Sequence, residues 1–253
     1  IIIVFMGCSA SAQSGTTIAA SETKQHASGL KLYYFPASQP SRAVAWFIEK
    51  HNLNIPFEVV DILHGESATP EYTAKNPFQG VPLLQLADGS YLSESSAILN
   101  YLAASNKIES EYPIADPLTI ARIHEAQLRH DALTRTVTTK VLRPALHGAM
   151  SGTATDAIKE SVEQNSGDLV WALEHINGVL GKTAFIAGDS LTVVDYLVTC
   201  ELNQLPLLEK FTGDKLRVAS YPNIARYLEV MKKVDGHDKQ LVFLTGLAAK
   251  ILA

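Results

Sequence analysis

Residues 81–102 read VPLLQLADGSYLSESSAILNYL, and this stretch decides the fold. Its apolar run from Val81 to Leu86 has the length of a buried strand, and Asp88-Gly89 after it is typical of a tight hairpin turn. Tyr91-Leu92 predicts a short returning strand, and the polar residues 93–95 begin an apolar helix. The stretch therefore predicts a β-hairpin that leads directly into a helix.

The preceding residues predict two further strands joined by a helix. Residues 32–35 predict a strand, and the apolar spacing of residues 44–48 marks one face of a helix that starts near Pro40. Residues 57–62 predict a second strand, parallel to the first because a helical crossover connects them, and residues 66–75 indicate a short helix. The order β-α-β-α-β-β-α predicts a four-stranded mixed sheet with helices on both faces, which is the thioredoxin-like arrangement.

The remainder of the chain is helical. Residues 107–117 form a polar, proline-bearing linker, and no convincing strand follows it. Helical spacing or continuous apolar character covers residues 118–147, 155–180 and 192–205 and a segment after Pro222. We therefore expect an N-terminal thioredoxin-like domain over residues 30–106 and an all-helical C-terminal domain over residues 118–253.

Thr192-Val-Val-Asp195 looks like a capping box with Asp in place of the usual Glu, and its expected function is the folding of the second domain. Cys200 follows on the same apolar helix. We interpret this thiol as part of the core rather than as a nucleophile.

Composition narrows the class of protein. The 21 basic and 26 acidic residues give a formal net charge of -5 without a basic run, so we expect no nucleic-acid partner. The two cysteines, Cys8 and Cys200, have no CxxC partner, and no Cys/His cluster has metal-ligand spacing. We expect no metal and a reduced, cytoplasmic setting.

The first twelve residues allow a cellular location other than the cytoplasm for the protein. The apolar run IIIVFMG is followed by Ala10-Ser11-Ala12, which resembles the end of a secretory leader with its cleavage site. Residues 1–12 are therefore either a secretory or organellar leader remnant or upstream sequence without a folded role. The run is too short to span a bilayer, and we expect residues 1–29 to be a disordered tail.

Two local motifs point to a small peptide ligand. Pro82 is either an edge-strand proline that spares a hydrogen bond, or part of a cis peptide through which Val81 offers its N–H and C=O to an extended ligand. At Glu94-Ser95, the start of a helix is either capped by a neighbouring serine or open to a carboxylate. Together the two motifs would line one groove for a small peptide with a carboxylate at each end.

Five segments carry a resemblance to a known family. Residues 33–43, NPFQGVPLL at 76–84, Asp88-Gly89, SESSAI at 93–98 and the segment 188–195 occur in the order expected of cytosolic glutathione transferases. The resemblance runs from about Leu30 to the C-terminus. Within the family, SQPSRA at 38–43 resembles the theta class, whose members use a serine in this loop.

The resemblance implies a set of site residues. Ser38 would stabilise the glutathione thiolate, and Arg135 falls where theta enzymes carry an arginine that faces the site. The remaining implied glutathione contacts are Val81 with Pro82 for the cysteinyl backbone, Glu94 and Ser95 for the γ-glutamyl end, and His64 and Gln79 near the glycyl carboxylate. The chain departs from the family pattern at Gly80, where relatives often have Lys or Gln.

Tyr34 is a rival to Ser38 as the thiolate donor, since Tyr34-Phe35-Pro36 resembles the strand end from which other classes offer a tyrosine hydroxyl. In those classes an arginine follows the tyrosine by about six positions, whereas Arg42 lies eight after Tyr34 and four after Ser38, the theta-like interval. We therefore expect Ser38 to be the donor and Tyr34 to form a wall of the substrate pocket. Arg42 is expected either to be structural or to support the residues that contact glutathione.

The implied activity is conjugation of glutathione, as co-substrate, to small hydrophobic electrophiles in detoxification, by a homodimer without a membrane partner. One alternative is a non-catalytic binding or scaffold domain of the same fold. A glutathione-dependent reductase or isomerase is a third hypothesis, and the absence of a cysteine from residues 36–41 disfavours it.

Overall fold

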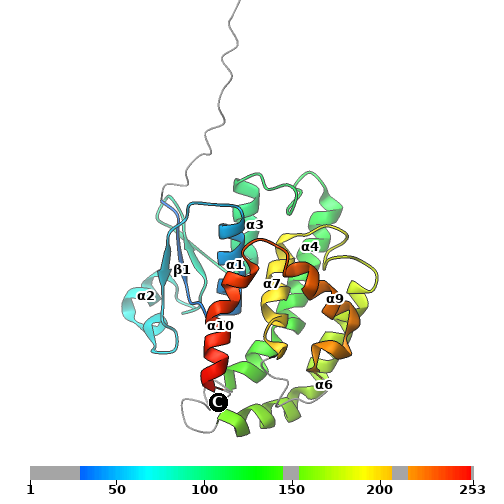
Figure 1. The fold of residues 1–253 in the computed structure, drawn as a ribbon. Coiled ribbons are helices and arrows are strands. Elements are labelled where there is room, and N and C mark those ends of the chain that lie inside the picture. The colour runs from blue at the N-terminus through cyan, green and yellow to red at the C-terminus, as the bar shows by residue number, and fades with distance from the viewer. Residues whose placement is uncertain (1–28, 145–153, 207–215, 252–253) are drawn as a thin grey trace, which may run out of the picture.

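The computed structural model describes residues 29–144, 154–206 and 216–251 (Figure 1). Residues 1–28, with the expected leader and Cys8, lie outside the described residues.

The four predicted strands form one mixed sheet. Strands β1 (Lys31–Tyr34), β2 (Phe57–Val59), β3 (Leu83–Gln85) and β4 (Tyr91–Ser93) are arranged in the order β2-β1-β3-β4. β1 pairs parallel with β2 and antiparallel with β3, and β3 pairs antiparallel with β4. The sheet therefore has the topology that the sequence predicts.

Strand β2 is shorter than the predicted 57–62 because the chain turns at Asp61. The Asp61 carboxylate accepts the backbone N–H groups of Leu63 and His64, at 3.0 and 3.2 Å. Such a side-chain turn competes with strand pairing, so the ladder ends just before it.

Helices cover both faces of the sheet. Leu32 on β1 faces the main core with α1 (Gln39–Lys50) and α3 (Ser95–Ser105). Tyr33, the next residue, points to the opposite face, where it packs with Tyr72 of α2 (Pro70–Lys75). This alternation is the ordinary period of two along a strand, and it confirms the predicted layers.

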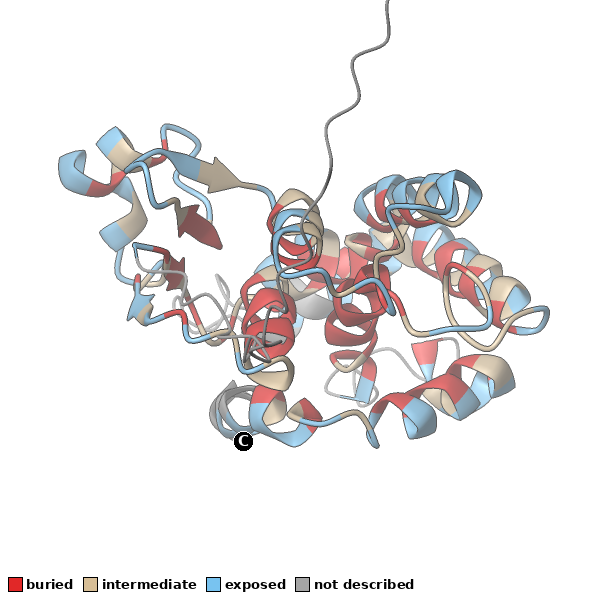
Figure 2. Ribbon diagram, turned by 90° about the horizontal axis from the view of Figure 1, so that it is seen from above, coloured by how far each residue is buried: buried red, intermediate tan, exposed pale blue. Residues whose placement is uncertain are grey.

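Helix α1 is buried on every side rather than on the single face that its spacing indicates. Residues 41–48 are all buried, because the sheet covers one side of α1 and α7 (Val193–Leu202) covers the other. Figure 2 shows these two buried helices side by side at the centre of the molecule. The contact between the two halves of the chain is thus itself part of the core.

The second half is helical within the described residues. Helix α4 (Pro117–Arg129) continues through the π-helical turns His130–Thr134 and Val137–Leu142, named η2 and η3. The other helices are α6 (Ala154–Leu180), α7, α9 (Pro222–Met231) and α10 (His237–Ile251). In the ranges that the structure covers, none of these helices is long and apolar enough to cross a bilayer.

The predicted capping box at the start of α7 is confirmed. The Asp195 carboxylate accepts the backbone N–H and the hydroxyl of Thr192, at 2.8 and 2.9 Å, together with the N–H of Ile186. Burial raises the pKa of Asp195 to about 6. The box therefore ties the preceding loop to the central helix.

Helix α10 has no counterpart in the sequence-based expectations. Trp46 of α1 fixes the start of this helix. Its indole N–H donates to the carbonyl of Asp235, just before α10, at 2.7 Å, and its ring contacts the ring of His237, the first residue of α10. Figure 1 shows α10 lying alongside α1. The docking of α10 therefore depends on a residue almost 190 positions away.

Candidate functional site

A cavity of about 600 Å³ lies between the loops at one edge of the sheet and the π-helical turns that follow α4. One wall comes from residues 35–40, the loop 76–82 and the start of α3, and the other comes from residues 131–143. The sequence-predicted residues that line it are Ser38, Gln79, Val81, Pro82, Glu94, Ser95 and Arg135. Most of the predicted site thus converges on one space.

Ser38 lies at the start of α1, where it is the N-cap residue. Its Oγ accepts the backbone N–H of Ser41 at 3.4 Å, so the hydroxyl proton remains free to donate. The part of the chain that the structure covers supplies no acceptor for that proton. The hydroxyl is therefore a donor at a positive helix terminus, which favours a negatively charged partner.

The loop before β3 has a cis peptide between Val81 and Pro82, which is the second of the two alternatives left open by the sequence. The residue before this peptide is fixed by two hydrogen bonds. The Tyr72 hydroxyl and the Asn76 amide both donate to the Gly80 carbonyl oxygen, at 2.7 and 2.9 Å. Gln79 has a left-handed φ of 57° and is exposed beside the cavity. Tyr72 and Asn76 were not expected as loop supports from the sequence.

The first turn of α3 is open. Glu94 is its N-cap residue, has a φ of 68°, and makes no side-chain capping bond. Neither Ser93 nor Ser95 therefore caps the helix, and the alternative of capping by a neighbouring serine is not observed. The unpaired N–H groups of this turn can bind an anion, and a non-glycine residue at positive φ is a feature that clusters at ligand sites.

The second wall centres on Arg135. Its Nη1 donates to Glu201 Oε1 at 2.6 Å, and Glu201 also accepts from Gln204 Nε2 at 2.9 Å and from the Thr138 hydroxyl. Burial raises the pKa of Glu201, while the Arg135 charge and these donors favour its ionised form. The side-chain carbonyl of Gln204 in turn accepts a hydrogen bond from Gln39, the residue after Ser38. A buried polar network thus connects the two walls.

Several residues of the second wall escaped the sequence analysis, although a signal was present. Asp131, Thr138 and Leu142 were not expected, and together with the expected Arg135 they line the cavity at intervals of four, three and four residues. This is the spacing of one helical face. Because most of these residues are polar, a search for apolar periodicity passes over the stripe.

Tyr34 does not reach the cavity, contrary to the expectation that it forms a wall. Its ring packs on Phe57 of β2 with centroids 5.1 Å apart, and burial, with the nearby charge of Glu49, raises its pKa. The Tyr34 ring therefore packs against β2 and does not line the cavity.

His64 is also separated from the cavity lining. Its side chain is 80% exposed and its Nδ1 contacts the Asp61 carboxylate at 2.7 Å, which raises the pKa of His64. The neighbours Ile62 and Leu63 line the cavity instead. The turn at Asp61 is what directs the imidazole away.

Arg42 and Cys200 are structural. The buried Arg42 guanidinium donates to the carbonyls of Ala37 and Cys200, at 2.9 and 3.3 Å, and so joins the Ser38 loop to α7. Burial raises the pKa of the Cys200 thiol to about 12, so it remains protonated and unreactive. Both observations agree with the roles expected from the sequence.

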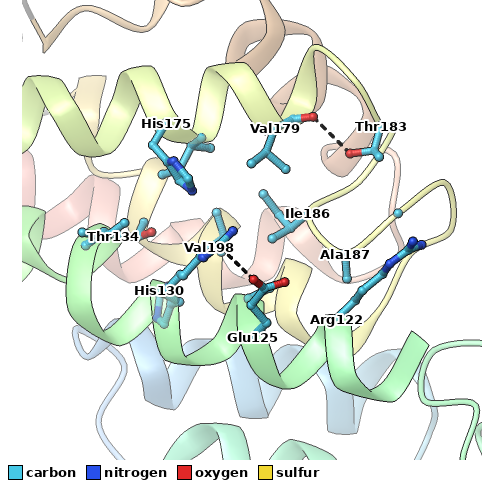
Figure 3. A pocket seen from close by; sticks show the side chains of 15 residues that line it. Arg122, Glu125, His130, Thr134, His175, Val179, Thr183, Ile186, Ala187 and Val198 are labelled. Atoms are coloured by element: carbon cyan, nitrogen blue, oxygen red, sulfur yellow. Dashed lines mark hydrogen bonds and ion pairs between the residues drawn. The ribbon is translucent and has the colours of Figure 1, made fainter. Parts of the chain in front are cut away.

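Figure 3 shows a second cavity, of about 290 Å³, on the other side of the α4 run. His175 and Val179 project into it from α6, and Glu125 on α4 pairs with Arg129 at 2.7 Å. It shares no lining residue with the larger cavity. Within the described ranges no group of three or more His, Cys, Asp or Glu side chains is arranged to hold a metal ion.

Comparison with known proteins identifies relatives of both halves. Residues 32–107 match the family model described as "Glutathione S-transferase, N-terminal domain", and residues 133–233 match the corresponding C-terminal domain. The chain is 34% identical to glutathione S-transferase theta-2 of Rattus norvegicus, over 88% of this chain and 91% of the relative. It is 30% identical to the theta-2 enzyme of Homo sapiens, over 88% and 92%.

A solved structure has the same fold. A delta-class glutathione transferase of Nilaparvata lugens superimposes with a TM-score of 0.72 at 25% identity, and the match covers 88% of this chain and 98% of that one.

Proposed function

Because the chain belongs to the glutathione S-transferase family, we propose that it joins the thiolate of glutathione to a small hydrophobic electrophile. The observation that carries this proposal is one cavity with three complementary features: the free Ser38 hydroxyl, Val81 at the cavity wall beside a cis peptide, and the uncapped start of α3. Donors for a thiolate, a peptide backbone and a carboxylate are the groups that glutathione requires.

The chemical task is to ionise the glutathione thiol near neutral pH. A free thiol has a pKa of about 8.5, and only the thiolate is a good nucleophile. Lowering that pKa by two units requires about 2.7 kcal/mol. A hydrogen bond to a charged group contributes about 1.5–3 kcal/mol and a helix N-terminus about 0.3–1 kcal/mol. Ser38 at the start of α1 supports both contributions.

In the proposed reaction the thiol proton leaves to solvent and the thiolate attacks the electrophilic carbon. A carbon–sulfur bond forms as the bond to the leaving group breaks, and the leaving group departs with the electron pair. Arg135 and Arg143 are the arginines that line the wall opposite Ser38, where this charge develops, and Arg135 is the one anchored by a buried carboxylate. We assign it to the substrate side of the site.

The glutathione contacts follow from the same wall. We assign Val81 and Pro82 to the cysteinyl backbone and Glu94 and Ser95 to the γ-glutamyl end, at the open start of α3. For the glycyl carboxylate we retain Gln79, because His64 lies off the cavity.

We further propose that residues 30–106 form the glutathione-binding domain, residues 107–117 the linker and residues 118–253 the substrate-binding domain. A cytoplasmic homodimer that acts in detoxification fits the relatives, which are glutathione transferases.

The test is an assay of the purified protein with glutathione and a nitrobenzyl halide, in which thioether formation is followed by absorbance. Binding of glutathione is measured separately by calorimetry. Enzyme-dependent thioether formation that saturates with glutathione is the expected result. Binding without any conjugation would instead support a non-catalytic member of the family.

A further inference from the structure

Glu201 is a buried carboxylate beneath the cavity that does not itself line it. Its side chain is 1% exposed and lies in the last turn of α7. Its two oxygens accept from three side chains, those of Arg135, Thr138 and Gln204. Replacing a buried ion pair with apolar side chains often leaves a protein equally stable. Stability alone therefore gives little reason for a carboxylate at this position.

The partners of Glu201 belong to both walls of the cavity. Arg135 and Thr138 line the second wall directly. Gln204, which donates to Glu201, accepts from Gln39 through its side-chain carbonyl, and Gln39 follows Ser38 in the first wall. One carboxylate thus holds groups on each side of the position assigned to the sulfur.

The geometry of Arg135 leaves donors available. Only its Nη1 is engaged by Glu201, and its side chain is 21% exposed at the cavity wall. The other guanidinium nitrogens have no partner among the described residues. A guanidinium anchored through one nitrogen keeps a defined direction for the rest, because the group is planar and rigid.

We propose that Glu201 is a positioning residue for the conjugation reaction, which fixes the Arg135 guanidinium over the cavity and braces the Gln39 side of the Ser38 loop. This inference rests on the proposed function. It assigns Glu201 an effect on the reacting groups, and not on the binding of glutathione, whose assigned contacts lie on the loop 76–82 and on α3.

The chain contains a matched control. Glu111 is also buried, and it accepts from Lys50 and from the Tyr196 hydroxyl at 2.8 Å, while its carboxylate lies 3.2 Å from His51 Nε2. It too joins the two halves of the chain, through α1 and α7. Neither Glu111 nor any of these three partners lines the cavity. Glu201→Gln and Glu111→Gln therefore remove similar charges, and only the first touches the proposed network.

The experiment compares steady-state kinetics of wild type, Glu201→Gln and Glu111→Gln. We expect Glu201→Gln to lower kcat/KM for the electrophile by about 10- to 100-fold, since a misplacement of about 1 Å in a reacting group can cost about 100-fold. The KM for glutathione should stay within about twofold of wild type, since uniform ground-state binding is not removed. Glu111→Gln should keep wild-type kinetics and only lower the melting temperature.

A double-mutant cycle with Arg135→Ala tests whether Glu201 acts through the arginine. Glu201→Gln should have little further effect in the Arg135→Ala background, because residues of one network are not additive. If Glu201→Gln does not fold, Gln204→Met removes the link to Gln39 and one donor to Glu201, and it leaves both members of the Arg135–Glu201 ion pair in place. This variant should lower kcat with the glutathione KM unchanged.

The two proposals fail differently. A folded wild-type protein that forms no thioether refutes the proposed function and this inference with it. An active wild type in which Glu201→Gln matches Glu111→Gln, or in which Gln204→Met has wild-type kcat, refutes the inference alone. Full additivity in the cycle with Arg135→Ala also overturns it.

Discussion

The assignment of Ser38 as the thiolate donor leads to a quantitative prediction for Ser38→Ala. The substitution removes a hydroxyl donor to a charged group, which is worth about 1.5–3 kcal/mol. Since one pKa unit corresponds to 1.36 kcal/mol, the pKa of bound glutathione should rise by about 1–2 units. The sign follows from the lost donor, which stabilised only the ionised form.

The free energy of unfolding should change much less in Ser38→Ala than the free energy of thiol ionisation. The capping bond from the Ser41 N–H to Ser38 Oγ is 3.4 Å long, beyond the usual distance for an N–H donor. Its loss should therefore cost about 0.5 kcal/mol, the lower end of the range for N-cap substitutions. A melting curve close to that of wild type is expected.

The assay is the pH dependence of kcat/KM for the electrophile at saturating glutathione, over roughly pH 5.5 to 9.5. Below the wild-type pKa, Ser38→Ala should be slower by about 10- to 100-fold, the rate equivalent of 1–2 pKa units. Above both pKa values its rate should approach that of wild type. General damage to the site would lower the rate at every pH, so the convergence at high pH is diagnostic.

Two variants serve as controls. Ser41→Ala removes the neighbouring serine, which is buried and accepts the Phe35 N–H at 3.3 Å, and should lower stability without moving the apparent pKa. Tyr34→Phe should also leave the apparent pKa in place, because the Tyr34 ring packs on Phe57 and does not line the cavity. The assignment of Ser38 is wrong if Tyr34→Phe raises the apparent pKa and Ser38→Ala does not.

Three further predictions concern binding, stability and assembly. Ser95→Ala should weaken glutathione binding by about 1–3 kcal/mol, as a lost hydrogen bond to a carboxylate; calorimetry with unchanged affinity and an unchanged circular dichroism spectrum would contradict the site. Burial lowers the pKa of His130 to about 3, so its contribution to the free energy of unfolding is complete above about pH 6.5 and is lost as the pH falls toward 3. The free energy of unfolding of His130→Gln, measured in urea, should accordingly depend less steeply on pH in that window. An equally steep pH dependence in this variant would contradict the role given to His130. The chain should sediment as a homodimer, and a species near 27 kDa at all concentrations would exclude this.

Local chemistry made much of the fold predictable. The hairpin turn at Asp88-Gly89 and the capping box at Thr192 each involve residues within a few positions of one another. The order of strands and helices follows from such local signals read along the chain. Turn and cap hydrogen bonds are made between near neighbours, so their residue types are visible in the sequence. The peptide bond before Pro82 is cis, which the sequence offered only as one of two alternatives.

Features that depend on packing between distant residues could not be predicted from local sequence signals. Helix α1 is buried all round because α7 covers its second side, and α10 docks through Trp46 and Asp235. Tyr34 and His64 lie near the expected site in sequence, but their side chains point elsewhere, since Phe57 and Asp61 are their partners. The direction of a side chain depends on what packs against it, and that partner is not encoded at a fixed spacing.

By itself the sequence determined the sheet, the helical second half, and the loop and helix starts that make one wall of the cavity. Arg135 was expected at the other wall from the family resemblance. Only the tertiary structure decided the rest of that wall and its support, where Arg135 meets Glu201 across 66 residues and Gln39 meets Gln204 across 165. Such pairs leave no period, motif or turn signal, because hydrogen bonds between distant residues constrain only their positions in space. A carboxylate that looks like one more polar residue of an apolar helix becomes the centre of the site's support only when α7 packs beneath the cavity.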